Sequence, residues 1–146
     1  MCLLLLASPA ALATLGQPAA TALQDGTPRT QARQLQSASG AQVQDQSIVT
    51  PTGVAVHEFS SGGVIFAIRW SGARMPDLSR LLGDYFPQYT AAVKAGLVRR
   101  RHPPTNLHDT QVVVHTGGHM RAYYGSAYVP DLVPAGVDLQ SLGVQP

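Results

Sequence analysis

The sequence predicts an α+β fold: an antiparallel sheet of two hairpins, with four or five strands, and one kinked helix packed on one face. Three observations lead to this class. Two pairs of β-branched and aromatic segments are each separated by a glycine-rich turn, one helical stripe of leucines and tyrosines lies between the pairs, and the order along the chain is strands, helix, strands. A single sheet with one helical layer is the simplest arrangement of such elements.

The chain begins with an apolar run, residues 1–13, that ends in Ala11-Leu12-Ala13, a pattern that signal peptidase accepts. We therefore expect a signal peptide cleaved before Thr14, and a mature protein that is periplasmic or secreted. The run is too short to cross a bilayer, which needs about 20 residues, so no transmembrane segment is expected in the mature chain. No Lys or Arg precedes Arg29, which indicates that the start is truncated.

Charge and cysteine content limit the functional classes. The 146 residues have a formal net charge of +2, and only 12% of them are charged. The isoelectric point is near 9.0, but so small a number of charges argues against a nucleic-acid partner. Cys2 is the only cysteine and lies in the signal. The mature chain is therefore expected to have no disulfide, no thiol nucleophile and no cofactor or metal held by cysteine.

Residues 14–46 are rich in Gln, Ala, Thr and Ser and contain few large apolar side chains. Such a segment cannot bury enough surface to offset the entropy lost when it becomes ordered. We interpret it as a flexible polar lead that folding does not require. The folded α+β domain is then placed in residues 47–146.

The first hairpin is predicted from Gly53–Phe59 and Val64–Trp70, which flank the turn residues Ser60-Ser61-Gly62-Gly63. Regular alternation assigns these residues to the core face: Ala55, His57, Phe59, Val64, Phe66, Ile68 and Trp70. The core position favours a hydrogen-bonded structural role for His57. Arg69 falls on the opposite face.

The predicted helix is Met75–Lys94. Pro76 and Asp77 suit its first turn, and one stripe at helical spacing contains Leu78, Leu81, Leu82, Tyr85, Tyr89 and Val93. Pro87 lacks the N–H group that would bond the carbonyl of Gly83, so a kink or two short helices are expected there. The basic segment 97–110 is expected to be a loop.

The second hairpin is predicted from Gln111–Thr116 and His119–Tyr124, with Gly117-Gly118 as a two-residue turn. Pairing across that turn places His119, Arg121 and Tyr123 on one face, which points away from the helix. The tail, Tyr128–Val137, is expected to be irregular and laid over the body of the domain.

Several motifs occur in order between Val54 and Val137: Gly63-Val64-Ile65-Phe66, Trp70-Ser71-Gly72, Pro76-Asp77-Leu78, Leu81-Leu82-Gly83-Asp84-Tyr85-Phe86, Gly117-Gly118-His119-Met120-Arg121 and Gly125-Ser126-Ala127-Tyr128-Val129-Pro130. Their combination resembles a domain-of-unknown-function family of small exported proteins from Gram-negative bacteria. The resemblance implies export and an intact domain, and it implies no particular activity.

No catalytic residue, no metal site and no cofactor is predicted. The sequence has no G-x-S-x-G elbow, and its carboxylates fall mostly at turn or helix-start positions. His115 and His119 have the H-x3-H spacing of some zinc sites. A turn at Gly117-Gly118 sends their rings to opposite faces, which argues against joint ligation.

Two groups of residues are candidates for binding. His119, Arg121 and Tyr123 combine residue types that are enriched at binding hot spots; the alternative is that the tail covers them and they only hold it down. The run Arg99, Arg100, Arg101 is the densest group of cations and is a candidate anion-binding loop. Its alternative role is to complement a helix C-terminus and keep a loop solvated.

The sequence thus favours an exported, non-catalytic binding or accessory protein of the cell envelope, with another envelope protein or a glycan as its partner. Two alternatives stay open. One is a hydrolase that acts on an envelope polymer, and the other is a binder of anionic surfaces through Arg99–Arg101.

Overall fold

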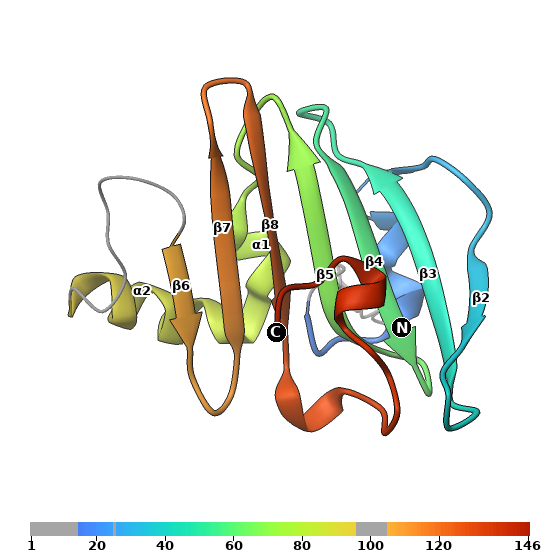
Figure 1. Cartoon of the computed structure of the whole chain (residues 1–146). Coiled ribbons are helices and arrows are strands. Elements are labelled where there is room, and N and C mark those ends of the chain that lie inside the picture. The colour runs from blue at the N-terminus through green and yellow to red at the C-terminus, as the bar shows by residue number, and fades with distance from the viewer. Residues whose placement is uncertain (1–14, 25, 96–104) are drawn as a thin grey trace, which may run out of the picture.

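The computed structural model describes residues 15–24, 26–95 and 105–146. The predicted signal, residues 1–13, and the candidate anion-binding residues Arg99, Arg100 and Arg101 lie outside the described residues. The described chain has an α+β fold, as predicted. In Figure 1 the helices lie behind one antiparallel sheet, and the C-terminal tail crosses in front of it.

The elements follow in this order: η1 (Ala19–Gln24), β1 (Thr27–Pro28), β2 (Arg33–Gln36), β3 (Gln42–Val49), β4 (Ala55–Ser61), β5 (Val64–Gly72), α1 (Leu78–Leu82), η2 (Gly83–Tyr85), α2 (Phe86–Lys94), β6 (Thr105–His108), β7 (Val113–His119), β8 (Ala122–Tyr128), η3 (Pro130–Leu132) and η4 (Gln140–Leu142). The strand order in the sheet is β1-β3-β4-β5-β8-β7-β6, and β2 also pairs with β3. Every pair is antiparallel.

The sheet has eight strands, so the prediction of four or five strands was too low. Strands β1, β2 and most of β3 come from residues 14–46, and β3 pairs with β4 from Gln44 to Val49. The interpretation of this segment as a flexible lead is therefore wrong for its described part. Strand pairing uses backbone N–H and C=O groups, which a glutamine-rich segment supplies like any other. A further strand, β6, lies in the predicted loop 97–110 and pairs with β7.

The first hairpin is confirmed, but a β-bulge alters its faces. Ala67 is opposite Phe59 and Ile65 is opposite Ser60, which leaves Phe66 as an extra residue in β5. Beyond the bulge, Ile68 and Trp70 join the cluster on the helix side of the sheet, whereas Phe66 and Ala67 join the cluster on the tail side. The predicted core face, which grouped His57 and Phe59 with Ile68 and Trp70, is therefore wrong.

The interrupted helix is confirmed. Asp77 caps α1, since its Oδ1 accepts a hydrogen bond from the backbone N–H of Ser79 at 3.0 Å. Gly83, with φ of 50°, ends α1, and α2 resumes with Pro87 in its first turn. All six residues of the predicted stripe lie in the helix-side cluster or against it. No helix in the described part of the chain is long and apolar enough to cross a membrane.

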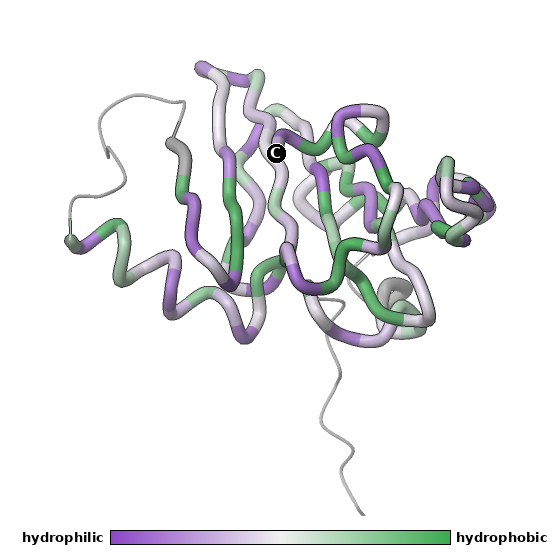
Figure 2. Tube along the Cα trace, turned by 60° about the horizontal axis from the view of Figure 1, so that its bottom comes forward, coloured by the Kyte–Doolittle hydropathy of each residue, from purple (hydrophilic) through white to green (hydrophobic). Residues whose placement is uncertain are grey.

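The sheet is covered on both faces. On the helix side, the cluster includes Leu15, Ile48, Ile68, Trp70, Leu82, Val114 and Ala127. On the tail side, Val43, Phe59, Phe66 and Ala67 form a cluster with Leu142 and Val144, and Val133 and Val137 pack against it. The prediction that Tyr128–Val137 lies over the body is confirmed through Val133 and Val137, and the covering segment, here called the tail, continues to Gln145. Figure 2 shows hydrophobic and hydrophilic residues interspersed along the chain. In β5 the successive residues Ile65–Ile68 are all buried, as a strand covered on both faces requires.

The second hairpin turns three residues later than predicted. His119 pairs with Ala122, so Met120 and Arg121 form the turn, and Gly117 and Gly118 lie within β7. Both positions require glycine because β8 approaches the backbone of β7 too closely there for a side chain. A Cβ atom at Gly118 would lie 2.1 Å from the carbonyl oxygen of Ala122, and one at Gly117 would lie 2.6 Å from the ring of Tyr124.

We predict that Leu15→Ala lowers the free energy of unfolding by about 2–5 kcal/mol, the usual cost of removing a buried leucine side chain. Leu15 is fully buried, and its N–H donates to the carbonyl of Leu81 at 3.0 Å. Urea unfolding of the full chain measures the change. Leu132→Ala, at a position 37% exposed, is the control and should cost much less. Equal losses for the two variants would contradict the anchoring of the N-terminal segment.

Candidate functional site

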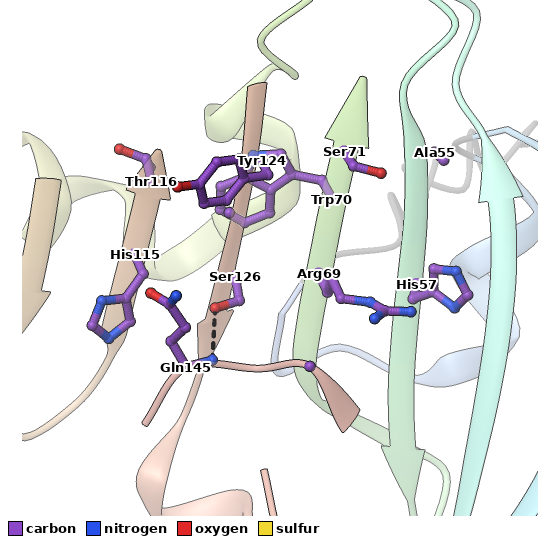
Figure 3. Close-up of a pocket in the computed structure, with 12 residues that line it drawn as sticks. Ala55, His57, Arg69, Trp70, Ser71, His115, Thr116, Tyr124, Ser126 and Gln145 are labelled. Carbon is purple, nitrogen blue, oxygen red and sulfur yellow. Dashed lines mark hydrogen bonds between the residues drawn. The ribbon is translucent and has the colours of Figure 1, made fainter. Parts of the chain in front are cut away.

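A cavity of about 420 Å³ lies on the tail side of the sheet. Its lining comes from β4, β5, β7, β8 and the end of the tail: Ala55, His57, Arg69, Trp70, Ser71, His115, Thr116, Tyr124, Gly125, Ser126, Gly143 and Gln145. Figure 3 shows polar side chains from four neighbouring strands directed to this face, with the tail segment around Gln145 along one side. No Asp or Glu is among the described residues that line it. We call this cavity the tail-side pocket.

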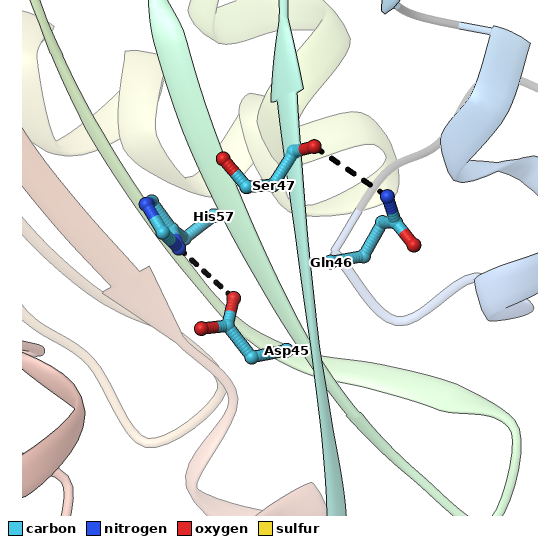
Figure 4. A network of polar contacts seen from close by, with 4 residues as sticks. All are labelled: Asp45, Gln46, Ser47 and His57. Atoms are coloured by element: carbon cyan, nitrogen blue, oxygen red, sulfur yellow. Dashed lines mark hydrogen bonds and ion pairs between the residues drawn. The ribbon is translucent and has the colours of Figure 1, made fainter. Parts of the chain in front are cut away.

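His57 on β4 is held by a carboxylate from the next strand. Its Nδ1 lies 2.9 Å from Oδ1 of Asp45 on β3 (Figure 4). Because a carboxylate only accepts, Nδ1 carries the hydrogen in this contact. The ring also stacks on Phe59, with centroids 6.3 Å apart. These two contacts fix the imidazole, and its other nitrogen, Nε2, makes no hydrogen bond with the described residues.

Arg69 on β5 is directly opposite His57 in the pairing of β4 with β5. In Figure 3 its guanidinium extends from the centre of the pocket toward His57. Within the described part of the chain, Arg69 forms no hydrogen bond and no ion pair. Gly143 of the tail lies against it, since a Cβ atom there would be 2.5 Å from Nη1 of Arg69. The guanidinium is therefore half-buried and positioned by the tail.

His115 on β7 and Ser126 on β8 form the other side of the pocket and are opposite each other in the sheet. The Ser126 hydroxyl accepts a hydrogen bond from the backbone N–H of Gln145 at 3.1 Å, which ties the tail to the sheet. Burial lowers the pKa of His115 below its usual value, and nearby His108 lowers it further, against a backbone hydrogen bond with Pro146 that raises it. Burial therefore favours the neutral form of this ring.

Two aromatic rings lie where glycines leave space on the neighbouring strand. Tyr124, which is 52% exposed, extends over Gly117 on the tail side. Trp70 lies against Gly125, where a Cβ atom would be 2.3 Å from Cζ2 of the indole. Trp70 is buried, and its Nε1 has no hydrogen-bond partner among residues 15–24, 26–95 and 105–146. Gly117 in β7 and Gly125 in β8 thus leave room for these two rings at the pocket.

The structure does not bring the predicted binding residues together on one face. Arg121 is in the turn, with φ of 66°, a conformation uncommon for non-glycine residues. Because of the later turn, His119 is opposite Ala122 and lies on the tail side of the sheet, the side that Tyr124 also faces. Tyr123, the neighbour of Tyr124 in β8, faces the helix side. The expected face pointing away from the helix is therefore wrong for Tyr123. Whether these residues bind a partner stays a prediction.

The later turn also places His115 and His119 on the same face, in contrast to the prediction. Four residues along an extended strand still separate them by about 13 Å, too far to share one ion. No group of three or more His, Cys, Asp or Glu in residues 15–24, 26–95 and 105–146 is arranged to hold a metal.

Sequence reasoning missed the pocket because the bulge at Phe66 was not foreseen. Strict alternation separates His57 and Arg69, whereas the shifted register places them opposite each other. Asp45 was hidden in the segment interpreted as a flexible lead. The available signal was a charged residue, Arg69, in the middle of an otherwise apolar strand, because such a residue needs either a partner or a ligand.

The fold and the pocket define a class of protein: a small α+β domain with a polar cavity on an antiparallel sheet. The model of a family described as Protein of unknown function (DUF2844) matches residues 11–142, and the chain belongs to this family. The match confirms the resemblance to a family of unknown function. No curated protein and no solved structure was found to match the chain.

We predict that His115 makes folding less favourable in mild acid. Its pKa is lower in the folded chain than in the unfolded one, so the unfolded chain binds the proton first. Its contribution to stability is complete above about pH 6.5 and is lost as the pH falls from there through the folded pKa. Unfolding of wild type and His115→Gln, measured from about pH 7.5 to pH 5, should give a weaker pH dependence for the variant.

The exposed His119, on the same strand, supplies the matched control. His119→Gln should leave the wild-type pH dependence unchanged. An equal slope in wild type and His115→Gln would show that the buried imidazole does not cause the acid sensitivity.

Proposed function

We propose that this chain is an exported, non-catalytic binding domain of the cell envelope that holds another envelope component, a protein or a glycan, in the tail-side pocket. One observation carries the proposal. The pocket gathers Arg69, which has no partner in the described residues, with the fixed imidazole of His57 and several hydroxyl groups. A concave site with a few converging polar groups is typical of ligand binding.

Export is supported by the apolar run that ends in Ala11-Leu12-Ala13. After cleavage the chain would contain no cysteine and could form no disulfide. The two apolar clusters on the two faces of the sheet would then stabilise the fold, which is compatible with export. The proposed location is periplasmic or secreted. Binding of anionic surfaces through Arg99–Arg101 is an alternative that rests on the sequence alone.

The alternative of a hydrolase acting on an envelope polymer has one observation in its favour. Asp45 orients His57 at 2.9 Å, as a carboxylate orients a general base in many hydrolases. A nucleophile is the missing part, since no hydroxyl in the described part of the chain donates a hydrogen bond to Nε2 of His57. The non-catalytic role is preferred for this reason. Hydrolysis of an envelope polymer that is lost in His57→Gln would replace it.

We predict that filling the pocket abolishes binding to the envelope. Ser71 is exposed, lines the pocket and lies on β5, where phenylalanine suits a strand. Sedimentation of the full chain with purified envelope fragments from its own cell should show at least about a tenfold loss of binding for Ser71→Phe. Ala122→Phe, exposed on the same sheet face outside the pocket, is the control and should bind as wild type. Wild-type binding by a folded Ser71→Phe variant would refute the pocket as the site.

We predict that the exported protein begins at Thr14, because cleavage follows Ala11-Leu12-Ala13. Cell fractionation followed by N-terminal sequencing measures this. Ala13→Arg should block cleavage, whereas Ala7→Ser, outside the cleavage motif, should not. A soluble cytoplasmic product that keeps residues 1–13 would contradict both the cleavage and the location.

A further inference from the structure

Resting on the proposed binding function, we infer that the tail-side pocket recognises the oxyanion of an acidic saccharide unit, a carboxylate or a phosphate, through Arg69 and His57. The inference adds the chemical class of the ligand to the site described above. Four features of the pocket lead to it: its charge, the fixed position of Arg69, the orientation of His57 and the space beside them.

The charge of the pocket favours an anion. Among the described residues, its lining contains one arginine, two histidines and four hydroxyl-bearing residues, and no Asp or Glu side chain. The carboxylate of Asp45, which contacts His57, is engaged by that imidazole. A guanidinium has five N–H donors and no acceptor, and none of these donors meets an acceptor in the described part of the chain. A ligand oxyanion is the group that a guanidinium binds best, because two parallel hydrogen bonds match its geometry.

The tail fixes the position of Arg69 before any ligand arrives. Val144 is 1% exposed within the tail-side cluster, and Gln145 is bonded to Ser126. Gly143 lies next to these two anchors with φ of 71°, and its lack of a side chain makes room for the guanidinium. An arginine held in this way loses less conformational entropy on binding than a free surface arginine does.

The orientation of His57 makes it the second ligand group. Asp45 occupies Nδ1, so the free nitrogen is Nε2, and the ring lies across from Arg69 in the sheet. Nε2 donates a hydrogen bond only in the imidazolium form, in which both ring nitrogens carry hydrogen. Two donor groups from adjacent strands then converge on one anion.

The pocket is larger than an oxyanion needs. A volume of about 420 Å³ falls in the range of sites for small organic ligands. Beyond Arg69, the remaining lining offers hydroxyl and amide groups from Ser71, Ser126 and Gln145, and the half-exposed ring of Tyr124. Hydroxyls and amides suit the hydroxyl groups of a sugar, and an aromatic ring provides an apolar surface with a polar tip. An acidic sugar therefore fits both parts of the pocket.

A structural role for Arg69 is the competing explanation, since its side chain also lies against the tail. The two roles differ in what a lysine would do. Arg69→Lys keeps the charge and most of the stem but loses the paired N–H groups, so it should fold and bind weakly. Melting temperatures of all variants separate loss of fold from loss of binding.

The test is calorimetric or NMR titration of the full chain with glucuronate, glucose 6-phosphate, glucose and inorganic phosphate. We expect glucuronate or glucose 6-phosphate to bind, and glucose to bind at least about tenfold more weakly, because hydrogen bonds to charged groups are the stronger ones. Arg69→Gln should weaken binding of the acidic sugar by about tenfold or more, with Arg69→Lys between. Arg74→Gln removes the same charge at an exposed residue without a contact and should bind as wild type.

The two acidic sugars distinguish a carboxylate from a phosphate as the recognised group. Equal affinity for glucose and glucuronate, or unchanged binding in a folded Arg69→Gln variant, would overturn the inference. Binding of inorganic phosphate as tightly as both acidic sugars would also overturn it, because the site would then not recognise the sugar part of the ligand. If Ser71→Phe abolishes envelope binding while Arg69→Gln does not, the proposed function stands and the ligand class is wrong. If neither variant affects envelope binding, the pocket itself is not the site.

Discussion

The antiparallel pairing of β5 with β8 joins the two halves of this domain into one sheet. The six paired positions from Ala67 to Gly72 link β1–β5, which precede the helices, to β6–β8, which follow them. Because β5 lies between β4 and β8, its side chains must meet a covering layer on each face. The helices supply one layer through Leu81 and Leu82, and the tail supplies the other through Leu142 and Val144. Removing either layer would expose apolar side chains of the same strand.

The bulge in β5 connects this architecture to the site. With one extra residue at Phe66, β5 can place Phe66 and Ala67 against the tail and still place Ile68 and Trp70 against the helix. The same shift puts Arg69 on the tail side, opposite His57. The pocket therefore uses a register change that the packing of the core already requires, and bulges are common next to functional sites for this reason.

The tail has two roles that follow from one set of contacts. Its apolar residues close the second core cluster, and its segment Gly143–Gln145 forms one side of the pocket. The hydrogen bond from Gln145 to Ser126 and the burial of Val144 hold that segment against the sheet. Stability and pocket shape are thus coupled, and a change that loosens the tail is expected to alter the position of Arg69 as well.

Local patterns in the sequence determined the class of fold, the interrupted helix with its Asp77 cap, the first hairpin and the tail over the body, because each depends on residues close together in the chain. Only the tertiary structure decided which polar segments become strands. A glutamine-rich segment has no apolar period of its own, and β3 forms because β4 offers it a free edge of N–H and C=O groups. The turn at Met120-Arg121 and the bulge at Phe66 also depend on packing. Pairing up to His119 brings Gly117 under the ring of Tyr124 and Gly125 against the ring of Trp70. The bulge lets β5 present apolar side chains to both faces of the sheet. Since His57, Arg69, His115 and Ser126 come from four strands, their meeting in one pocket depends on that register, which no local pattern contains.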